Sequence, residues 1–183
     1  MSSVEIKIGG FGGQGIILTG YVIGKAASIF DGKFATMMQS FGPEARGGAA
    51  SAQVIVSEKR ILYPYVTNPD ILIALSQEAY KRFINEVKPD GLLLYEEELV
   101  QPGKLPGKIK KYGIPATRLA EQLGRKIVLN MVMLGFFSTL TDVIATDAIS
   151  RAINDTVPKG TEELNLMAFE KGLNYGKKFV RTK

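Results

Sequence analysis

A glycine-rich turn lies between two apolar segments near the start of the chain and limits the folds open to it. Residues 10–15 read G-F-G-G-Q-G. The apolar run at 4–8 is typical of a short buried strand, and residues 16–30 are apolar on nearly every face of a helix. Glycines at such a junction let the backbone turn sharply and approach a ligand or partner closely. Because the first N–H groups of a helix lack intrahelical acceptors, the turn predicts an anion-binding site.

Two residue types are missing from the 183-residue chain, which contains no cysteine and no histidine. Their absence excludes disulfides, thiol nucleophiles and cysteine-ligated iron–sulfur clusters. It also excludes Ser-His-Asp and Cys-His catalysis, and it leaves only carboxylates as ligands for zinc. We therefore expect no metal site, and no catalysis by this chain alone.

The order of the apolar segments predicts the fold class. Strand-like and helix-like patterns alternate through the first two thirds of the chain, and the part from residue 126 onward is helical apart from short turns. The length suits one domain. We predict a single α/β domain over residues 1–183, with three α/β/α layers, a mostly parallel sheet and a helical C-terminal third.

Charge and apolar content bear on partners and location. The net charge is +5, and basic residues cluster at 104–111 and 177–183, neither with the alternating aromatic residues of a base-stacking platform. This pattern favours solvated faces or an acidic partner over nucleic acid, although a nucleic-acid-binding module stays open as a third hypothesis. No apolar run is long enough to cross a membrane, and the N-terminus lacks a signal-peptide pattern, so we expect a cytoplasmic protein without membrane contact.

The glycine turn also fits a dinucleotide-binding motif, because Gly10, Gly12 and Gly15 satisfy the spacing G-x-G-x-x-G. Residues 34–39 are expected to form the second strand of a βαβ unit. An acidic residue should end that strand and hold the ribose, but the sequence continues with Gln39 and Ser40. A self-contained Rossmann-like dinucleotide-binding oxidoreductase is therefore the alternative hypothesis rather than the leading one.

A second glycine-rich loop follows that strand. Residues 42–48 read G-P-E-A-R-G-G and bracket one carboxylate and one guanidinium between turn-forming residues. Because the loop follows a strand of the same unit, we expect it at the same carboxyl edge of the sheet as the first turn. Either Glu44 and Arg46 pair on the surface, or Arg46 binds a carboxylate or phosphate. Both interpretations stay open.

The two glycine-rich loops together resemble the gamma subunit of the 2-oxoacid:ferredoxin oxidoreductases, in which G-x-G-G-Q-G opens the chain. The loop at 42–48 is similar to the version in 2-oxoglutarate-type enzymes, whereas pyruvate-type subunits usually carry a more arginine-rich loop. The segments at 130–135 and 165–172 also look like family segments. The resemblance covers essentially the whole chain, and an indolepyruvate-type subunit is a close variant of it.

The resemblance implies a subunit with no catalytic residue of its own. The family decarboxylates a 2-oxoacid on thiamine diphosphate, transfers the acyl group to coenzyme A and passes electrons through iron–sulfur clusters to ferredoxin. Thiamine diphosphate is implied in the alpha and beta subunits and the clusters in beta and delta, which agrees with the lack of cysteine here. The implied partners are thus the alpha, beta and delta subunits, with ferredoxin as the electron acceptor of the complex.

The two loops supply the candidate site residues. Free helix amides suit a phosphate, and coenzyme A is the phosphate-bearing reactant of the family. We hypothesise that the loops line a coenzyme A channel or the docking surface beside it, with Gln14 giving amide hydrogen bonds and Arg46 giving charge. The other interpretation is that both loops only pack against partner subunits. The candidate residues are Gly10, Gly12, Gly13, Gln14, Gly15, Glu44, Arg46, Gly47 and Gly48.

Overall fold

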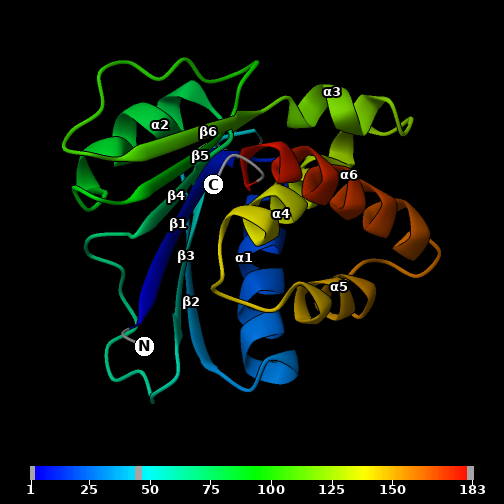
Figure 1. Cartoon of the computed structure of the whole chain (residues 1–183), viewed down its shortest axis with the longest axis horizontal. Coiled ribbons are helices and arrows are strands. Elements are labelled where there is room, and N and C mark those ends of the chain that lie inside the picture. Colours follow the sequence, from blue (N-terminus) through cyan, green and yellow to red (C-terminus); the bar gives the residue numbers. More distant parts are fainter. Residues whose placement is uncertain (1–2, 44–46, 181–183) are drawn as a thin grey trace.

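One six-stranded sheet organises the molecule, with strand order β2-β3-β1-β4-β5-β6. The computed structural model describes residues 3–43 and 47–180 (Figure 1). The strands are β1 (Val4–Phe11), β2 (Phe34–Phe41), β3 (Ala49–Ser57), β4 (Ile71–Ala74), β5 (Leu92–Glu96) and β6 (Lys110–Ile114). The α-helices are α1 (Ile16–Lys25), α2 (Gln77–Phe83), α3 (Ala116–Glu121), α4 (Leu129–Leu140), α5 (Thr146–Asn154) and α6 (Glu162–Val180). The short helices are η1 (Ala26–Phe30, a π-helix), η2 (Ile84–Glu86) and η3 (Lys126–Val128).

Two separate cores lie on the two faces of the sheet. Along β4, Ile71 and Ile73 belong to a large core shared with α1 and with the helices from α3 onward. Leu72 and Ala74 point to the other face, where α2 covers a smaller core (Figure 1). A strand buried on both faces is apolar at every position, which explains its unbroken apolar sequence. The predicted three-layer α/β/α domain with a helical C-terminal third is confirmed.

The sheet is parallel except at β3. β1, β4, β5 and β6 form a parallel block, whereas β3 lies antiparallel between β1 and β2. The short connection at 42–48 joins neighbouring strands, and a short connection returns the chain antiparallel. β1 and β2 therefore run in the same direction, as the predicted βαβ unit requires, but β3 separates them.

The closest helix contact is between α4 and α6. A Cβ atom on Gly135 would lie 1.9 Å from the carbonyl oxygen of Phe169, and one on Gly172 would lie 1.9 Å from that of Val132. The two backbones thus touch where the helices cross, and only glycine fits on either side. Thr139 adds a hydrogen bond from its Oγ1 to the carbonyl oxygen of Leu173, at 3.1 Å.

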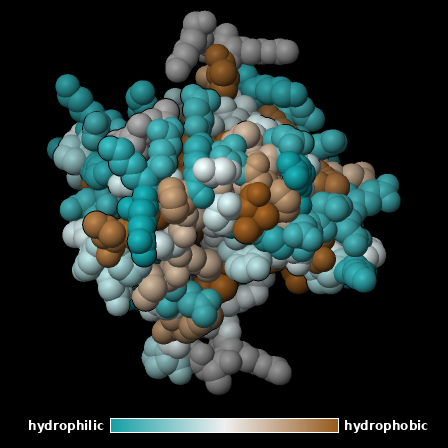
Figure 2. All heavy atoms as spheres, turned by 90° about the horizontal axis from the view of Figure 1, so that it is seen from below, coloured by the Kyte–Doolittle hydropathy of each residue, from teal (hydrophilic) through white to brown (hydrophobic). Residues whose placement is uncertain are grey.

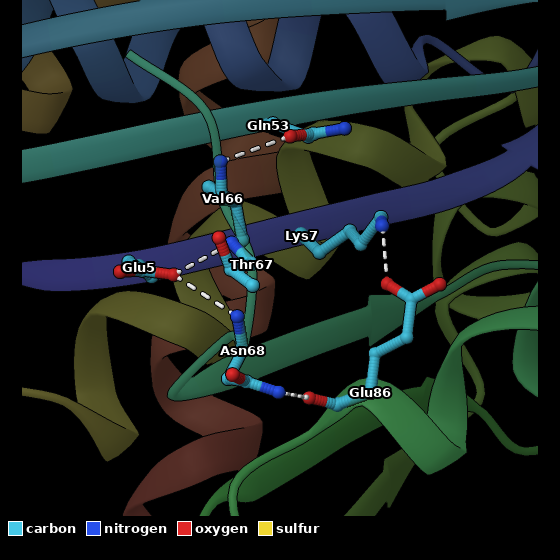
Figure 3. A network of polar contacts seen from close by, with 7 residues as sticks. All are labelled: Glu5, Lys7, Gln53, Val66, Thr67, Asn68 and Glu86. Carbon is cyan, nitrogen blue, oxygen red and sulfur yellow. Dashed lines mark hydrogen bonds and ion pairs between the residues drawn. The ribbon is translucent and has the colours of Figure 1, made fainter. Parts of the chain in front are cut away.

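A polar network fixes the segment before β4 to the sheet (Figure 3). The carboxylate of Glu5 accepts hydrogen bonds from the N–H groups of Thr67 and Asn68, at 3.1 and 3.3 Å. Lys7 is buried on the α2 face, where its ammonium pairs with Glu86 and lies 4.3 Å from the ring centroid of Phe83. A buried ammonium needs a paired anion, so this contact stabilises the α2 layer against β1.

Glu96 is a fully buried carboxylate at the end of β5. It accepts hydrogen bonds from the N–H of Glu98 and from both the N–H and the hydroxyl of Thr117, at 2.6 to 3.0 Å. Since Thr117 is in the first turn of α3, this carboxylate satisfies amides that the helix leaves unpaired. Burial raises the pKa of Glu96 above its ordinary value, and the donated backbone hydrogen bonds oppose that rise only in part.

The surface is mixed in character. On the face shown in Figure 2, hydrophobic groups are interspersed among hydrophilic side chains. Lys110, Lys111 and Lys177 are exposed, as the solvated-face interpretation of the basic clusters expects. No helix within the described ranges is both long and apolar enough to cross a membrane.

The crossing of α4 and α6 predicts a strong substitution effect. Gly172→Ala should lower the free energy of unfolding by about 3 kcal/mol, because the new methyl group forces the two backbones apart. Gly24→Ala is the matched control: no atom lies within 4 Å of its Cβ position, so it should raise stability by roughly 0.5–1 kcal/mol. Urea unfolding measures both. Equal stability of the two variants would contradict the close backbone contact between α4 and α6.

The pKa of Glu96 predicts a pH effect on stability. A raised folded-state pKa means that the folded chain binds the proton more tightly, so this carboxyl lowers stability progressively as the pH rises from about 4.3 to the raised value. In Glu96→Gln this contribution is absent. The unfolding free energy of the wild type minus that of the variant should therefore fall with rising pH through this window. A difference that is constant or rises with pH would contradict the assignment.

Candidate functional site

The structure brings the two glycine-rich segments together at the carboxyl ends of β1 and β2. Antiparallel pairing places Phe11 opposite Ala49. The N–H of Gly12 donates to the carbonyl oxygen of Gly48 at 2.8 Å, and a Cβ on Gly12 would lie 3.4 Å from the Cα of Gly47. The predicted meeting of the loops at one sheet edge is therefore observed for the described residues of the second loop.

The glycines of the first turn serve different physical purposes. Gly13 and Gly15 have φ values of 93° and 72°, which an L side chain rarely adopts. No atom lies within 4 Å of the Cβ position of Gly13, so its backbone faces open space. A Cβ on Gly15 would lie 2.3 Å from Nδ2 of Asn130, and one on Gly10 would lie 2.5 Å from Oε1 of Gln14. Gly10 and Gly15 are thus packing positions, and Gly13 is the open one.

Gln14 holds the turn in place. Its Oε1 accepts a hydrogen bond from the N–H of Phe11 at 2.6 Å, and its Nε2 donates to the carbonyl oxygen of Leu75 at 2.8 Å. Both ends of the side-chain amide are therefore used within the chain. The sequence suggested that this amide contacts a ligand, whereas the structure assigns it the task of tying the turn to the end of β4.

A large, mainly apolar cavity opens beside the two glycine segments. Its volume is about 760 Å³, within the size range of small-molecule sites. It lies between the first turn, the residues around η3 and the segment that leads into α6. None of the described lining residues is acidic, and Arg125 contributes a cation. The polar side chains in the lining are Arg125, Asn130, Thr161 and Asn165.

The N-terminus of α1 faces this cavity. The first hydrogen bond of the helix runs from Thr19 N–H to the carbonyl oxygen of Gly15, at 2.8 Å. The N–H groups of residues 16–18 precede that bond and have no acceptor in the described chain. No side chain caps the helix, and its first turn contains no acidic residue. These amides and the positive end of the helix dipole favour an anion in the cavity.

The sequence reasoning missed the polar groups on the far wall of the cavity. Asn130 and Asn165 belong to segments that resemble the family, and neither they nor Arg125 and Thr161 are among the candidate site residues. A signal was present for Asn130, because it is the one strongly polar residue in an otherwise apolar helical run. Such a residue is either paired in the core or exposed to a site.

The sequence analysis also raised a Glu44–Arg46 pair, a dinucleotide site and the question of a metal site. Glu44 and Arg46 lie outside the described residues, so their pairing is not described. The position expected to hold a ribose acid, at Gln39 and Ser40, lies within β2, and β3 separates β2 from β1, which removes the geometry of a dinucleotide site. Within residues 3–43 and 47–180 no group of three or more carboxylates is arranged to hold a metal, and the chain has no cysteine to hold a cluster.

The bonds of Gln14 predict that it is structural. Gln14→Met should lower the free energy of unfolding by about 1–3 kcal/mol, because the N–H of Phe11 and the carbonyl of Leu75 lose their partner. Gln122→Met on the exposed surface is the control, with an expected change of about 0.5 kcal/mol or less. Thermal unfolding of both variants measures this difference. A destabilisation no larger than that of the control would mean that the turn is stable without the two hydrogen bonds of Gln14.

The comparisons with known proteins agree with this architecture. The sequence profile of the pyruvate ferredoxin/flavodoxin oxidoreductase family (POR) matches residues 5–175. The chain is 47% identical to 2-oxoglutarate synthase subunit KorC of Methanocaldococcus jannaschii, over 94% of each chain. It resembles the crystal structure of the keto/oxoacid ferredoxin oxidoreductase gamma subunit from Geobacter sulfurreducens, with a TM-score of 0.84, 39% identity and coverage of 96% and 99% of the two chains.

A longer structure shares the fold as well. The 2-oxoglutarate:ferredoxin oxidoreductase from Magnetococcus marinus, solved with 2-oxoglutarate, coenzyme A and succinyl-CoA bound, matches with a TM-score of 0.87 and 26% identity. The match covers 97% of this chain and 32% of that one. These relatives are oxidoreductases or subunits of them, which supports the leading hypothesis and not the self-contained dinucleotide enzyme. The chain therefore belongs to the pyruvate ferredoxin/flavodoxin oxidoreductase family, and its resemblance to gamma subunits is confirmed.

Proposed function

We propose that this chain, acting as one unit over residues 1–183, is the gamma-type subunit of a 2-oxoacid:ferredoxin oxidoreductase complex. The complex oxidatively decarboxylates a 2-oxoacid to the acyl-CoA, and the proposed substrate is 2-oxoglutarate. The nearly full-length similarity to a 2-oxoglutarate synthase subunit supports this substrate. The chain contributes assembly and a coenzyme A channel, and it supplies no catalytic group.

One observation carries the coenzyme A assignment. The two glycine segments meet at the mouth of an apolar cavity, into which the uncapped N-terminus of α1 points. Coenzyme A combines anionic phosphates with a long, mostly uncharged arm, and an apolar cavity with one anion-binding end suits such a molecule. The proposed contacts in the turn are the backbone of Gly12 and Gly13, and the sequence of the second loop offers Glu44 and Arg46 as further candidates. A relative of the same fold was solved with coenzyme A bound.

The remaining chemistry is assigned to partner chains. Thiamine diphosphate and the iron–sulfur clusters would reside in alpha, beta and delta subunits, and ferredoxin would accept the electrons. A chain without cysteine cannot ligate a cluster, which supports this division. The relatives are themselves named as subunits.

Reconstitution tests the proposal. Co-expression of the chain with candidate thiamine-binding and cluster-bearing subunits from the same organism should give a complex that reduces ferredoxin only when 2-oxoglutarate and coenzyme A are both present. The isolated chain should be inactive. Turnover of a nicotinamide or flavin by the isolated chain would contradict the proposal, as would full activity of the complex without it.

Arg46 tests the coenzyme A edge within that complex. Arg46→Ala should raise the KM for coenzyme A about tenfold or more, because a charge-assisted hydrogen bond to a phosphate is lost. The control is Arg60→Ala, at the opposite end of β3, which should leave both KM values unchanged. If Arg46→Ala changes the KM of neither coenzyme A nor the 2-oxoacid, the second loop only packs against partner subunits.

A further inference from the structure

The two edge strands of the sheet differ in how they are protected against pairing with another strand. β6, at one edge, has five residues and exposes Lys110 and Lys111. A short strand and exposed lysines are common devices that keep a sheet edge from pairing with another chain. β2, at the other edge, has eight residues and contains no charged residue and no proline. The β2 edge therefore lacks these protective features.

The outward backbone groups of β2 are unpaired in the described chain. The N–H of Gly42 donates to the carbonyl oxygen of Ala49 at 2.6 Å, and the register between β2 and β3 is uninterrupted. Because hydrogen-bonded residues alternate along an antiparallel pair, the even-numbered residues of β2 bond to β3 and the odd-numbered ones point away from it. The residues with outward N–H and C=O groups are Ala35, Met37, Gln39 and Phe41. Within residues 3–43 and 47–180 none of these groups has a hydrogen-bond partner.

Exposed apolar side chains lie near this edge. Phe34, the first residue of β2, is 49% exposed. The segment 61–66 is tied to the neighbouring strand, since the N–H of Val66 donates to Oε1 of Gln53 at 3.1 Å (Figure 3). Gln53 is in turn opposite Met38 of β2. The exposed apolar residues of that segment are Leu62, Tyr63 and Tyr65.

The sequence of β2 suits antiparallel pairing with itself. Two identical strands can pair in this way only if their outward-pointing residues face one another. A register centred on Met38 meets this condition for all of them, because Ala35 then lies opposite Phe41 and Met37 opposite Gln39. A small side chain thus lies opposite a large one. A register centred on either neighbour of Met38 places one outward residue opposite a position outside β2.

The same register supplies a partner for Thr36. Its Oγ1 is buried and has no hydrogen-bond partner in the described chain. Buried hydroxyl groups are nearly always paired, so this one calls for an explanation. In the register centred on Met38, Thr36 lies opposite Ser40 of the second copy, and Ser40 is exposed. Cross-strand hydroxyl pairs of this kind form hydrogen bonds once χ1 of Thr36 turns toward the edge.

We propose that β2 is a docking edge for a second copy of this chain. The two β2 strands pair antiparallel about a twofold axis at Met38, and the sheet of one copy continues into the sheet of the other. Every contact then occurs twice, as a symmetric dimer requires. Main-chain hydrogen bonds supply affinity in strand addition, and the exposed apolar side chains near the edge add contact area. Coenzyme A binding and the choice of 2-oxoacid play no part in this pairing.

Single cysteine variants test the register, since the chain itself has no cysteine. Opposed residues in a non-hydrogen-bonded antiparallel pair have Cα atoms about 4.5 Å apart, which a disulfide can span. Met38→Cys should therefore give a disulfide-linked dimer when the purified full chain is mildly oxidised. Thr36→Cys alone should not, because the two copies of residue 36 lie about 14 Å apart along the strands, but a mixture of Thr36→Cys and Ser40→Cys should. Non-reducing electrophoresis measures the products.

A proline variant tests the main-chain hydrogen bonds. The N–H of Gln39 points away from β3, so Gln39→Pro removes an outward donor and leaves the bonds to β3 in place. The wild-type chain should sediment at twice the mass of one chain at high concentration. Gln39→Pro should raise the dissociation constant about tenfold or more, because each dimer loses two hydrogen bonds. Sedimentation equilibrium over a concentration series measures both constants.

Gln39→Ala is the matched control, because it changes the same side chain but keeps the N–H. It should dimerise as the wild type does. Circular dichroism spectra that match the wild type confirm that both variants are folded. If Gln39→Pro does not fold, the cysteine variants still test the pairing.

Several results would overturn the inference. They are a wild-type chain that is monomeric throughout the series, cross-linking of Thr36→Cys as efficient as that of Met38→Cys, and equal dissociation constants for Gln39→Pro and Gln39→Ala. A monomeric chain that assembles with partner subunits, but no longer does so as Gln39→Pro, would mean that a strand of a partner subunit occupies the edge, which also overturns it. In each case ferredoxin reduction by the wild-type complex leaves the proposed function standing.

Discussion

The antiparallel pairing of β1 with β3 sets the strand order and the position of the glycine segments. It runs from Val4 opposite Val56 to Phe11 opposite Ala49, and it ends where Gly12 donates to the carbonyl oxygen of Gly48. Because β3 occupies this place, β2 is displaced to the edge of the sheet and the second glycine segment lies against the first. The same pairing removes the neighbour that a dinucleotide site would need and creates the edge at which the cavity opens.

Several residues of the site meet two structural needs at once. Gly15 starts α1 with a positive φ and also leaves room for Asn130, while Gly10 leaves room for the side chain that braces the turn. Gln14 then connects the turn to the end of β4 through two hydrogen bonds. A turn fixed from three sides keeps the N–H groups of α1 pointing at the cavity, which is the preorganisation that binding an anion requires.

The helical C-terminal third supplies the other wall of the cavity. α4 and α6 can approach closely only because Gly135 and Gly172 remove the side chains between their backbones. This contact brings the start of α4 and the start of α6 to the same place, and with them Asn130 and Asn165. A substitution at the crossing would therefore affect stability and the shape of the cavity together.

The layers, the position of the glycine turn and the lack of cluster and thiol chemistry could all be predicted from the sequence. Alternating apolar runs specify strands and helices locally, and the missing residue types are a property of composition. Three features become visible only in the folded chain: β3 lies between β1 and β2, Gln14 is turned inward, and Asn130 lines a cavity. Strand order, side-chain direction and the partners of a buried amide depend on residues far apart in the chain, such as Gly15 and Asn130, and no local pattern encodes their meeting.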